Sequence, residues 1–209
     1  MKTLLGLLSA FLISAFLPAA AAAELAPDAL VKTVTNEVLD AVRQDKDIRH
    51  GNAKKALELV ETKILPHFNF YRMTQLALGR EARKASPEQM KALVDEFRTL
   101  LVRTYSKALT EYRDQEIVFK PFKMAPTDTD VRVRTEVKQS GGKPVEIDYY
   151  LEKGGQGWKV YDIEVAGASL VTNYRSTFAQ EIQKGGVDGL IKSLQEKNKA
   201  LETAPAKAK

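Results

Sequence analysis

Past the middle of the chain the spacing of apolar side chains changes from a helical to a strand pattern and later changes back, and this feature constrains the fold more than any other. From Met90 to Tyr112 apolar residues recur every three or four positions, whereas from Val131 to Val137 they alternate with charged residues. The first spacing places them on one face of a helix and the second on one face of a strand. Helical segments precede and follow the alternating block, so the sequence predicts an α+β fold with an antiparallel sheet.

The sheet is expected to be a curled antiparallel meander of four strands, because the two clearest alternating segments, residues 131–138 and 145–152, form a hairpin with one apolar face and one polar face. Glycine turns at residues 140–142 and 154–157 separate three of these segments. The expected strands are residues 116–120, 131–138, 145–152 and 158–165.

Six helices are expected around this sheet. The clearest start is Ser86-Pro87-Glu88-Gln89, a capping box with proline at the first helical position. It should open one long helix of about seven turns that lies across the sheet. Gly185 and Gly186 should interrupt the last helical segment. The expected helices are residues 26–45, 52–65, 71–78, 86–112, 169–184 and 187–201.

The first 23 residues have the order of an export signal: a positive charge at Lys2, an apolar run from Leu4 to Leu17, and Ala21-Ala22-Ala23 before Glu24. The run is shorter than the roughly 20 residues that span a bilayer. Residues 1–23 are therefore predicted to be a cleaved signal peptide, which places the protein in the periplasm.

The sequence contains no cysteine, which excludes disulfides, thiolate metal sites and a lipidated cysteine at the cleavage point. Residues 24–202 are expected to form a single domain, and residues 203–209 a disordered tail. Basic and acidic residues are interleaved, with a net charge of +5, so a nucleic-acid binder is not indicated.

Catalytic and metal-binding motifs are not found, and the two histidines, His50 and His67, are expected to be surface or packing residues. The carboxylate of interest is Asp162, which by alternation should share a face with Trp158 and Val160. Two interpretations of Asp162 stay open. It is either a partly buried general base or a hydrogen-bond acceptor for neighbouring backbone at the end of the sheet.

Several short motifs together indicate a protein family. They read Met73-Thr-Gln-Leu-Ala-Leu-Gly79, Ser86-Pro-Glu-Gln-Met90, Trp158-Lys-Val-Tyr-Asp-Ile-Glu-Val165, Gly167-Ala-Ser-Leu-Val171 and Asn173-Tyr-Arg175. At this spacing they resemble the MlaC family of periplasmic phospholipid-binding proteins, also called toluene-tolerance auxiliary proteins. The resemblance extends over residues 28–198, nearly the whole chain after the export signal.

The resemblance implies an NTF2-like or cystatin-like cone that holds phospholipid as cargo, without a cofactor, a metal or enzymatic activity. Such a protein would be a soluble carrier between an outer-membrane lipoprotein–porin complex and an inner-membrane ABC transporter with a substrate-binding ring. It would thereby maintain outer-membrane lipid asymmetry. We expect a monomer. Two other functions stay open: a small-molecule enzyme that uses Asp162, and a structural adaptor of the envelope.

The expected lipid-binding residues lie on the inward face of the long helix, on the apolar face of the hairpin and in the segment after the sheet. For each of them singly, an ordinary core position is an open alternative. They are Phe97, Leu101, Tyr105, Leu109, Val133, Val137, Ile147, Tyr149, Leu151, Leu170, Val171, Tyr174 and Phe178.

Overall fold

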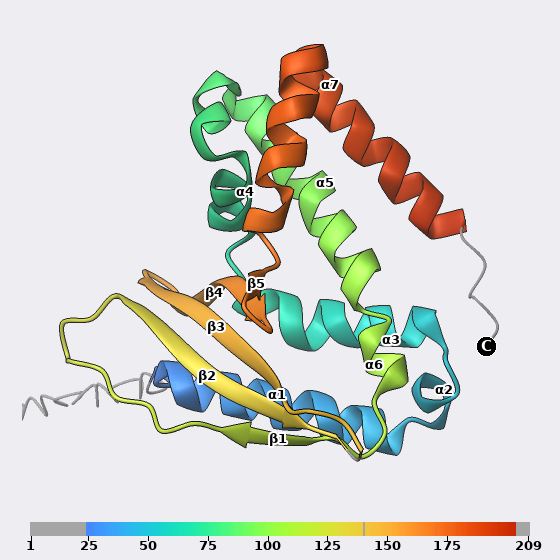
Figure 1. Ribbon diagram of the computed structural model, residues 1–209, viewed down its shortest axis with the longest axis vertical. Coiled ribbons are helices and arrows are strands. Elements are labelled where there is room, and N and C mark those ends of the chain that lie inside the picture. The colour runs from blue at the N-terminus through green and yellow to red at the C-terminus, as the bar shows by residue number, and fades with distance from the viewer. Residues whose placement is uncertain (1–23, 140, 204–209) are drawn as a thin grey trace, which may run out of the picture.

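The computed structural model describes residues 24–139 and 141–203, in which an antiparallel sheet meets a group of helices (Figure 1). The predicted α+β fold is confirmed. The predicted signal peptide, residues 1–23, lies outside the described residues. So does all of the predicted tail except Thr203, which instead ends the last helix.

Figure 1 shows two parts, the sheet with α1 alongside it and a group of helices that contains α4, α5 and α7. The strands are β1 (Glu116–Phe119), β2 (Asp130–Lys138), β3 (Val145–Gly154), β4 (Gly157–Val165) and β5 (Ala168–Ser169). The α-helices are α1 (Pro27–Gln44), α2 (Lys46–Arg49), α3 (Ala53–Leu59), α4 (Phe70–Leu78), α5 (Pro87–Tyr105), α6 (Ala108–Glu111) and α7 (Arg175–Thr203). Helix α1 runs along the sheet, whereas α4, α5 and α7 form a separate group beyond its β4–β5 edge.

The sheet has five strands in the order of the sequence, one more than predicted. The additional strand, β5, is only two residues long and pairs with the end of β4. Ala166 and Gly167 both have positive φ, 49° and 81°, and so reverse the chain tightly enough for this pairing. Two residues are too few to show a period-two pattern, which is why sequence alternation did not reveal the strand.

A β-bulge in β4 changes which side chains share a face. Tyr150 pairs with Asp162 but Leu151 pairs with Val160, so Tyr161 is an additional residue without a partner. Beyond it the alternation is inverted, and Asp162 lies on the face opposite to Val160. The prediction that Asp162 shares a face with Trp158 and Val160 is therefore wrong.

The predicted long helix is shorter than expected. Its capping box is present, since Gln89 N donates to Ser86 Oγ over 3.1 Å and Ser86 N donates to Gln89 Oε1 over 3.0 Å. However, α5 ends at Tyr105, and a turn precedes the four-residue helix α6. The apolar side chains of α5 pack against α4 and α7, whereas Leu109 of α6 packs toward α1. One straight helix could not direct its apolar side chains both toward α4 and α7 and toward α1.

Two other predicted helices also begin or end differently. The α-helix expected over residues 52–65 stops at Leu59 and continues as a π-helix (Val60–Ile64) and a 3-10 helix (Leu65–His67). We call residues 60–68 the connector. The helix expected from Ser169 begins at Arg175, because Ser169 belongs to β5 and its Oγ accepts from Thr172 N over 2.9 Å. The predicted break near Gly186 is observed, with φ of 67°.

Buried apolar side chains form three groups around a less densely filled region. The largest lies among α4, α5 and α7 and includes Leu93 and Phe97, both without exposed surface. A second joins α1 to the apolar face of the sheet, and a third joins α1, α2 and α3 to Tyr112. The connector lies where the three groups approach one another, and this is where the cavities are found.

Candidate functional site

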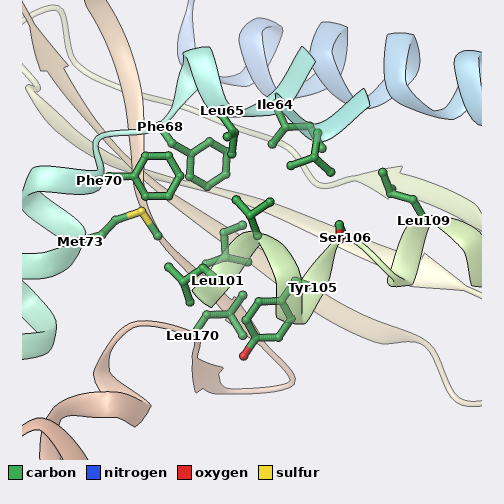
Figure 2. A pocket seen from close by; sticks show the side chains of 13 residues that line it. Ile64, Leu65, Phe68, Phe70, Met73, Leu101, Tyr105, Ser106, Leu109 and Leu170 are labelled. Atoms are coloured by element: carbon green, nitrogen blue, oxygen red, sulfur yellow. The ribbon is translucent and has the colours of Figure 1, made fainter. Parts of the chain in front are cut away.

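A first cavity lies between the connector, the start of α4 and the end of α5 (Figure 2). Its cavity volume is about 180 Å³, and part of it opens to solvent. Phe68, Phe70 and Met73 approach from one side in Figure 2, and Leu101, Tyr105 and Leu170 from the other. The lining consists of Val60, Ile64, Leu65, Phe68, Phe70, Met73, Leu101, Val102, Tyr105, Ser106, Leu109, Ile163 and Leu170.

A second cavity of about 250 Å³ lies between α1 and the apolar face of the sheet. The inward face of α1 contributes the largest share of its wall. The lining consists of Leu30, Val31, Val34, Thr35, Val38, Leu39, Ile64, His67, Phe68, Leu109, Ile117, Tyr149, Val160 and Ile163.

The two cavities share part of their walls. Four side chains line both, and we call them the partition: Ile64, Phe68, Leu109 and Ile163. Ile163 is exposed to both cavities because the bulge in β4 returns it to the apolar face. The cavities are thus neighbours within one apolar region of the protein.

The chemistry of both linings is almost entirely that of hydrocarbon. Polar side chains in the second cavity are Thr35, His67 and Tyr149, and none of them is a carboxylate. Burial raises the pKa of the Tyr149 phenol, so this group stays neutral. Burial, together with the nearby Lys159 ammonium, lowers the pKa of His67 and favours its neutral form. Such walls suit an uncharged apolar ligand.

The structure places five of the thirteen predicted site residues at the cavities. Leu101, Tyr105 and Leu170 line the first cavity, Tyr149 lines the second, and Leu109 lines both.

The other eight lie elsewhere in the fold. Phe97, Tyr174 and Phe178 form an aromatic group between α5 and α7, with the Phe97 ring centroid 5.1 Å from each of the other two, and Val171 is buried beside them. Val133 and Leu151 are buried beneath α1, and Val137 and Ile147 are half-buried positions of the sheet.

Much of the cavity wall was missed by sequence reasoning. The helix over residues 26–45 was expected, but its inward face, which includes Val34 and Val38, was not linked to a cavity. Phe68, at the end of the connector, and Phe70, at the start of α4, were the clearest unused signal. Their spacing fits no regular period, because the chain there passes from a 3-10 helix through Phe68 and Asn69 into α4.

Asp162 is buried, with 7% of its surface exposed. Its carboxylate accepts hydrogen bonds from two backbone amides and one side-chain hydroxyl. Oδ1 accepts from Ile163 N over 2.8 Å and from Val171 N over 3.3 Å, while Oδ2 accepts from Ser169 Oγ over 2.6 Å. Burial raises the pKa of Asp162, and these hydrogen bonds oppose that effect. Asp162 is thus a hydrogen-bond acceptor that holds the segment before α7, which is one of the two interpretations left open by the sequence. Its side chain lies on the face of the sheet opposite to that of Val160 and Ile163.

Within residues 24–139 and 141–203 no group of three or more histidine, aspartate or glutamate side chains is arranged to hold a metal ion. Over the same residues, no helix combines the length and the apolar character needed to cross a bilayer.

Comparison with known proteins identifies a family. The profile of the family described as MlaC protein matches residues 32–196. The chain is 25% identical over 190 residues to the intermembrane phospholipid transport system binding protein MlaC of Haemophilus influenzae, covering 89% of each chain. It is 27% identical over 205 residues to the toluene tolerance protein ttg2D of Pseudomonas putida, covering 94% of each.

A solved structure is also similar. It is the phospholipid-binding protein from Ralstonia solanacearum, determined in complex with a phospholipid. The two chains are 45% identical and superimpose with a TM-score of 0.78, over 84% of this chain and 98% of the other.

Proposed function

The chain belongs to the MlaC protein family, and on this premise we propose that it is a soluble periplasmic carrier of glycerophospholipid. The lipid is cargo and not a cofactor, and the protein catalyses no reaction on it. The acyl chains lie in the apolar cavities, while the head group stays at the surface.

The observation that carries this proposal is the pair of adjoining apolar cavities. The cavities, of about 180 and 250 Å³, are lined by hydrocarbon side chains, which suits them to acyl chains. The phospholipid bound by the Ralstonia solanacearum protein supports the same assignment, because that protein is 45% identical to this one.

The energetics of such a site favour exchange over permanent retention. Moving a methylene from water into an apolar site gains about 0.8 kcal/mol, so two tails of ~15 methylenes gain about 24 kcal/mol relative to water. A bilayer offers nearly the same gain. A carrier therefore needs only to match the membrane, and a membrane partner must supply the path and, for net transport, the energy.

The partners follow from the family. The carrier takes lipid between an outer-membrane lipoprotein–porin complex and an inner-membrane ABC transporter with a substrate-binding ring, and so maintains outer-membrane lipid asymmetry. A periplasmic location, reached through the predicted signal peptide of residues 1–23, places it between the two membranes. The enzyme alternative loses its support because Asp162 faces away from both cavities and is held by three hydrogen bonds.

Native mass spectrometry of the protein purified from the periplasm of a Gram-negative host tests this function. We expect a mass increment that disappears on organic extraction and matches phospholipid in the extract. Recovery of protein that never carries lipid, even after incubation with phospholipid vesicles, would contradict the proposal.

A further inference from the structure

We propose that a basic hollow at the corner between α2 and α6 binds a phosphate group. The basic hollow is lined by Lys46, Arg49, His50 and Arg113, opens to solvent, and has a volume of about 550 Å³. These four residues line neither of the two apolar cavities, so the site is separate from the one proposed for acyl chains. Figure 1 shows α2 and α6 beside each other near the end of α1.

The charges that line the basic hollow are all of one sign. Its lysine and its two arginines form no ion pair within the described part of the chain. The nearby carboxylates of Asp45 and Asp47 are both paired with Lys55, at 3.2 and 2.7 Å. Glu111 and Asp114, close to Arg113 in the sequence, are exposed and do not line the hollow. Cations that share one concavity without a counter-ion create a local potential that attracts an anion.

Both walls of the basic hollow are attached to buried residues. Ile48 of α2 is 3% exposed and belongs to the same apolar group as Tyr112, the residue before Arg113. The Asp45 carboxylate caps α2, since its Oδ1 accepts from Asp47 N over 2.8 Å and from Ile48 N over 3.2 Å. The basic side chains therefore project from backbone that is held in place.

Arg113 is oriented by backbone carbonyls and not by a carboxylate. Its Nη1 donates to Thr110 O over 2.8 Å and to Tyr112 O over 2.7 Å. These bonds fix the guanidinium plane without cancelling its charge. Among the described residues they engage only Nη1, which leaves the hydrogens of Nη2 and Nε for a ligand. A guanidinium presents such hydrogens as a fork that matches the oxygens of a phosphate.

The number of donors and the size of the basic hollow favour a phosphate over a carboxylate. A phosphate group has up to about two negative charges and more acceptor oxygens than a carboxylate, so several basic side chains can share it. The hollow is also larger than a lone phosphate and leaves room for an organic group attached to it. Such a phosphate ester is either a soluble molecule or the head group of an anionic phospholipid in a membrane surface.

The test uses the double variant Arg49→Gln with Arg113→Gln. Lys46→Gln with Arg49→Gln is a second hollow variant, which keeps the Arg113 hydrogen bonds if their loss prevents folding. The matched control is Lys197→Gln with Lys199→Gln, which removes the same charge from exposed positions of α7. Circular dichroism and thermal unfolding establish that each variant is folded.

Inorganic phosphate, glycerol phosphate and glycerol are titrated into isotope-labelled protein and followed by amide shifts in nuclear magnetic resonance. Because none of these probes has an acyl chain, the apolar cavities do not contribute. Both phosphates should shift the amides of residues 46–50 and 113 with a Kd of about 1 mM or tighter, and glycerol should not. The hollow variants should weaken this binding at least about tenfold, since charge-assisted hydrogen bonds are lost, and the control should not.

Flotation with vesicles distinguishes the two sources of the phosphate. The vesicles contain phosphatidylglycerol in phosphatidylcholine, or phosphatidylcholine alone, in which a choline cation compensates the phosphate charge. If the source is a membrane head group, each basic residue removed from the hollow should weaken binding to phosphatidylglycerol about fivefold. If the source is a soluble ester, flotation should be equal in all variants while the titrations still differ.

Two results would overturn the inference: no phosphate-dependent shifts at the basic hollow, or equal phosphate affinity in the hollow variants and the control. The carrier function is judged separately, by native mass spectrometry of lipid that co-purifies with each variant. We expect that lipid to be unchanged in all of them, because the basic hollow lies outside both cavities.

Discussion

The packed helical core and the cavity region are built from the same kinds of residue, yet only the first is filled. Between α5 and α7 the rings of Phe97, Tyr174 and Phe178 contact one another edge-on or tilted, and Phe97 has no exposed surface. Between α1, the connector and β4, similar side chains surround cavities of about 180 and 250 Å³. An apolar pattern thus tells which face of an element points inward, but not whether neighbouring elements fill the space there.

The largest expected effect is that of Phe97→Ala in the packed core. Removing this buried ring should lower the free energy of unfolding by about 3–5 kcal/mol, because its neighbours cannot close the space. Urea unfolding followed by circular dichroism measures the change. Tyr71→Ala is the control, since Tyr71 is 53% exposed and should cost less than about 0.5 kcal/mol. A loss below about 1 kcal/mol for Phe97→Ala would mean that this core is not tightly packed.

One identical substitution made in both regions tests the comparison itself. Leu190→Ala removes a side chain of α7 that is 1% exposed in the packed core, and should cost about 3 kcal/mol. Leu170→Ala removes a half-buried side chain that borders empty space, and should cost about 1 kcal/mol because fewer contacts are lost. The same urea experiment, on delipidated protein, gives both values. Equal losses would contradict the distinction between filled and unfilled regions.

Arg72 of α4 connects the packed helical core to strands β2, β3 and β4 of the sheet. Its guanidinium on α4 contacts Glu152, lies 2.7 Å from Asp130 Oδ2, and stacks 3.7 Å from the ring centre of Tyr161. Arg72→Met should lower the free energy of unfolding by about 2 kcal/mol, since it leaves the half-buried Glu152 carboxylate without its cation.

Arg72→Lys should restore only part of that stability, because an ammonium cannot bridge two carboxylates and stack on the ring in the same geometry. Full recovery with lysine would show that charge alone matters at this contact.

The smallest expected effect is a pH dependence at Asp162, which links β4 to the segment before α7. Its pKa is raised in the folded protein by burial, so the neutral form is favoured there. Its contribution to stability is therefore complete below the unfolded pKa of about 3.9 and is lost as the pH rises through the folded value. Asp162→Asn should lack this decline.

Urea unfolding of the wild type and Asp162→Asn at several pH values from about 3.5 to 6.5 measures the difference. We expect the wild type to lose stability relative to the variant as the pH rises. A wild type that instead gains stability relative to the variant over this range would show that the hydrogen bonds to Asp162 outweigh its burial.

Regular periodicity and capping residues accounted for most of the fold. The capping box at Ser86 and the break at Gly186 depend on local backbone chemistry, and both are present where the sequence indicated. The bulge at Tyr161 and the turn after Tyr105 depend on long-range packing, and a single sequence contains no local signal for either. The inverted face of Asp162 and the position of Leu109 follow from these two irregularities, so neither could be predicted.

The candidate site was predicted in part for a related reason. Leu101 and Tyr105 at the end of α5 line the first cavity, but Phe97, on the same helix face one turn before Leu101, is buried against α7. Helical spacing places these side chains on one stripe and cannot tell where along it the packing ends. The boundary is set by α7 and by the π-helical connector, and neither arrangement is visible in the spacing of α5.

The central claim is that the apolar cavities hold acyl chains, and a crystal structure with a phospholipid brominated in both tails tests it most directly. Anomalous scattering locates each bromine without reference to the shape of other density. We expect bromine peaks inside the cavities, beside Leu101 in the first and beside Val34 in the second. Bromine peaks confined to the outer surface, with both cavities filled by rearranged side chains, would contradict the account.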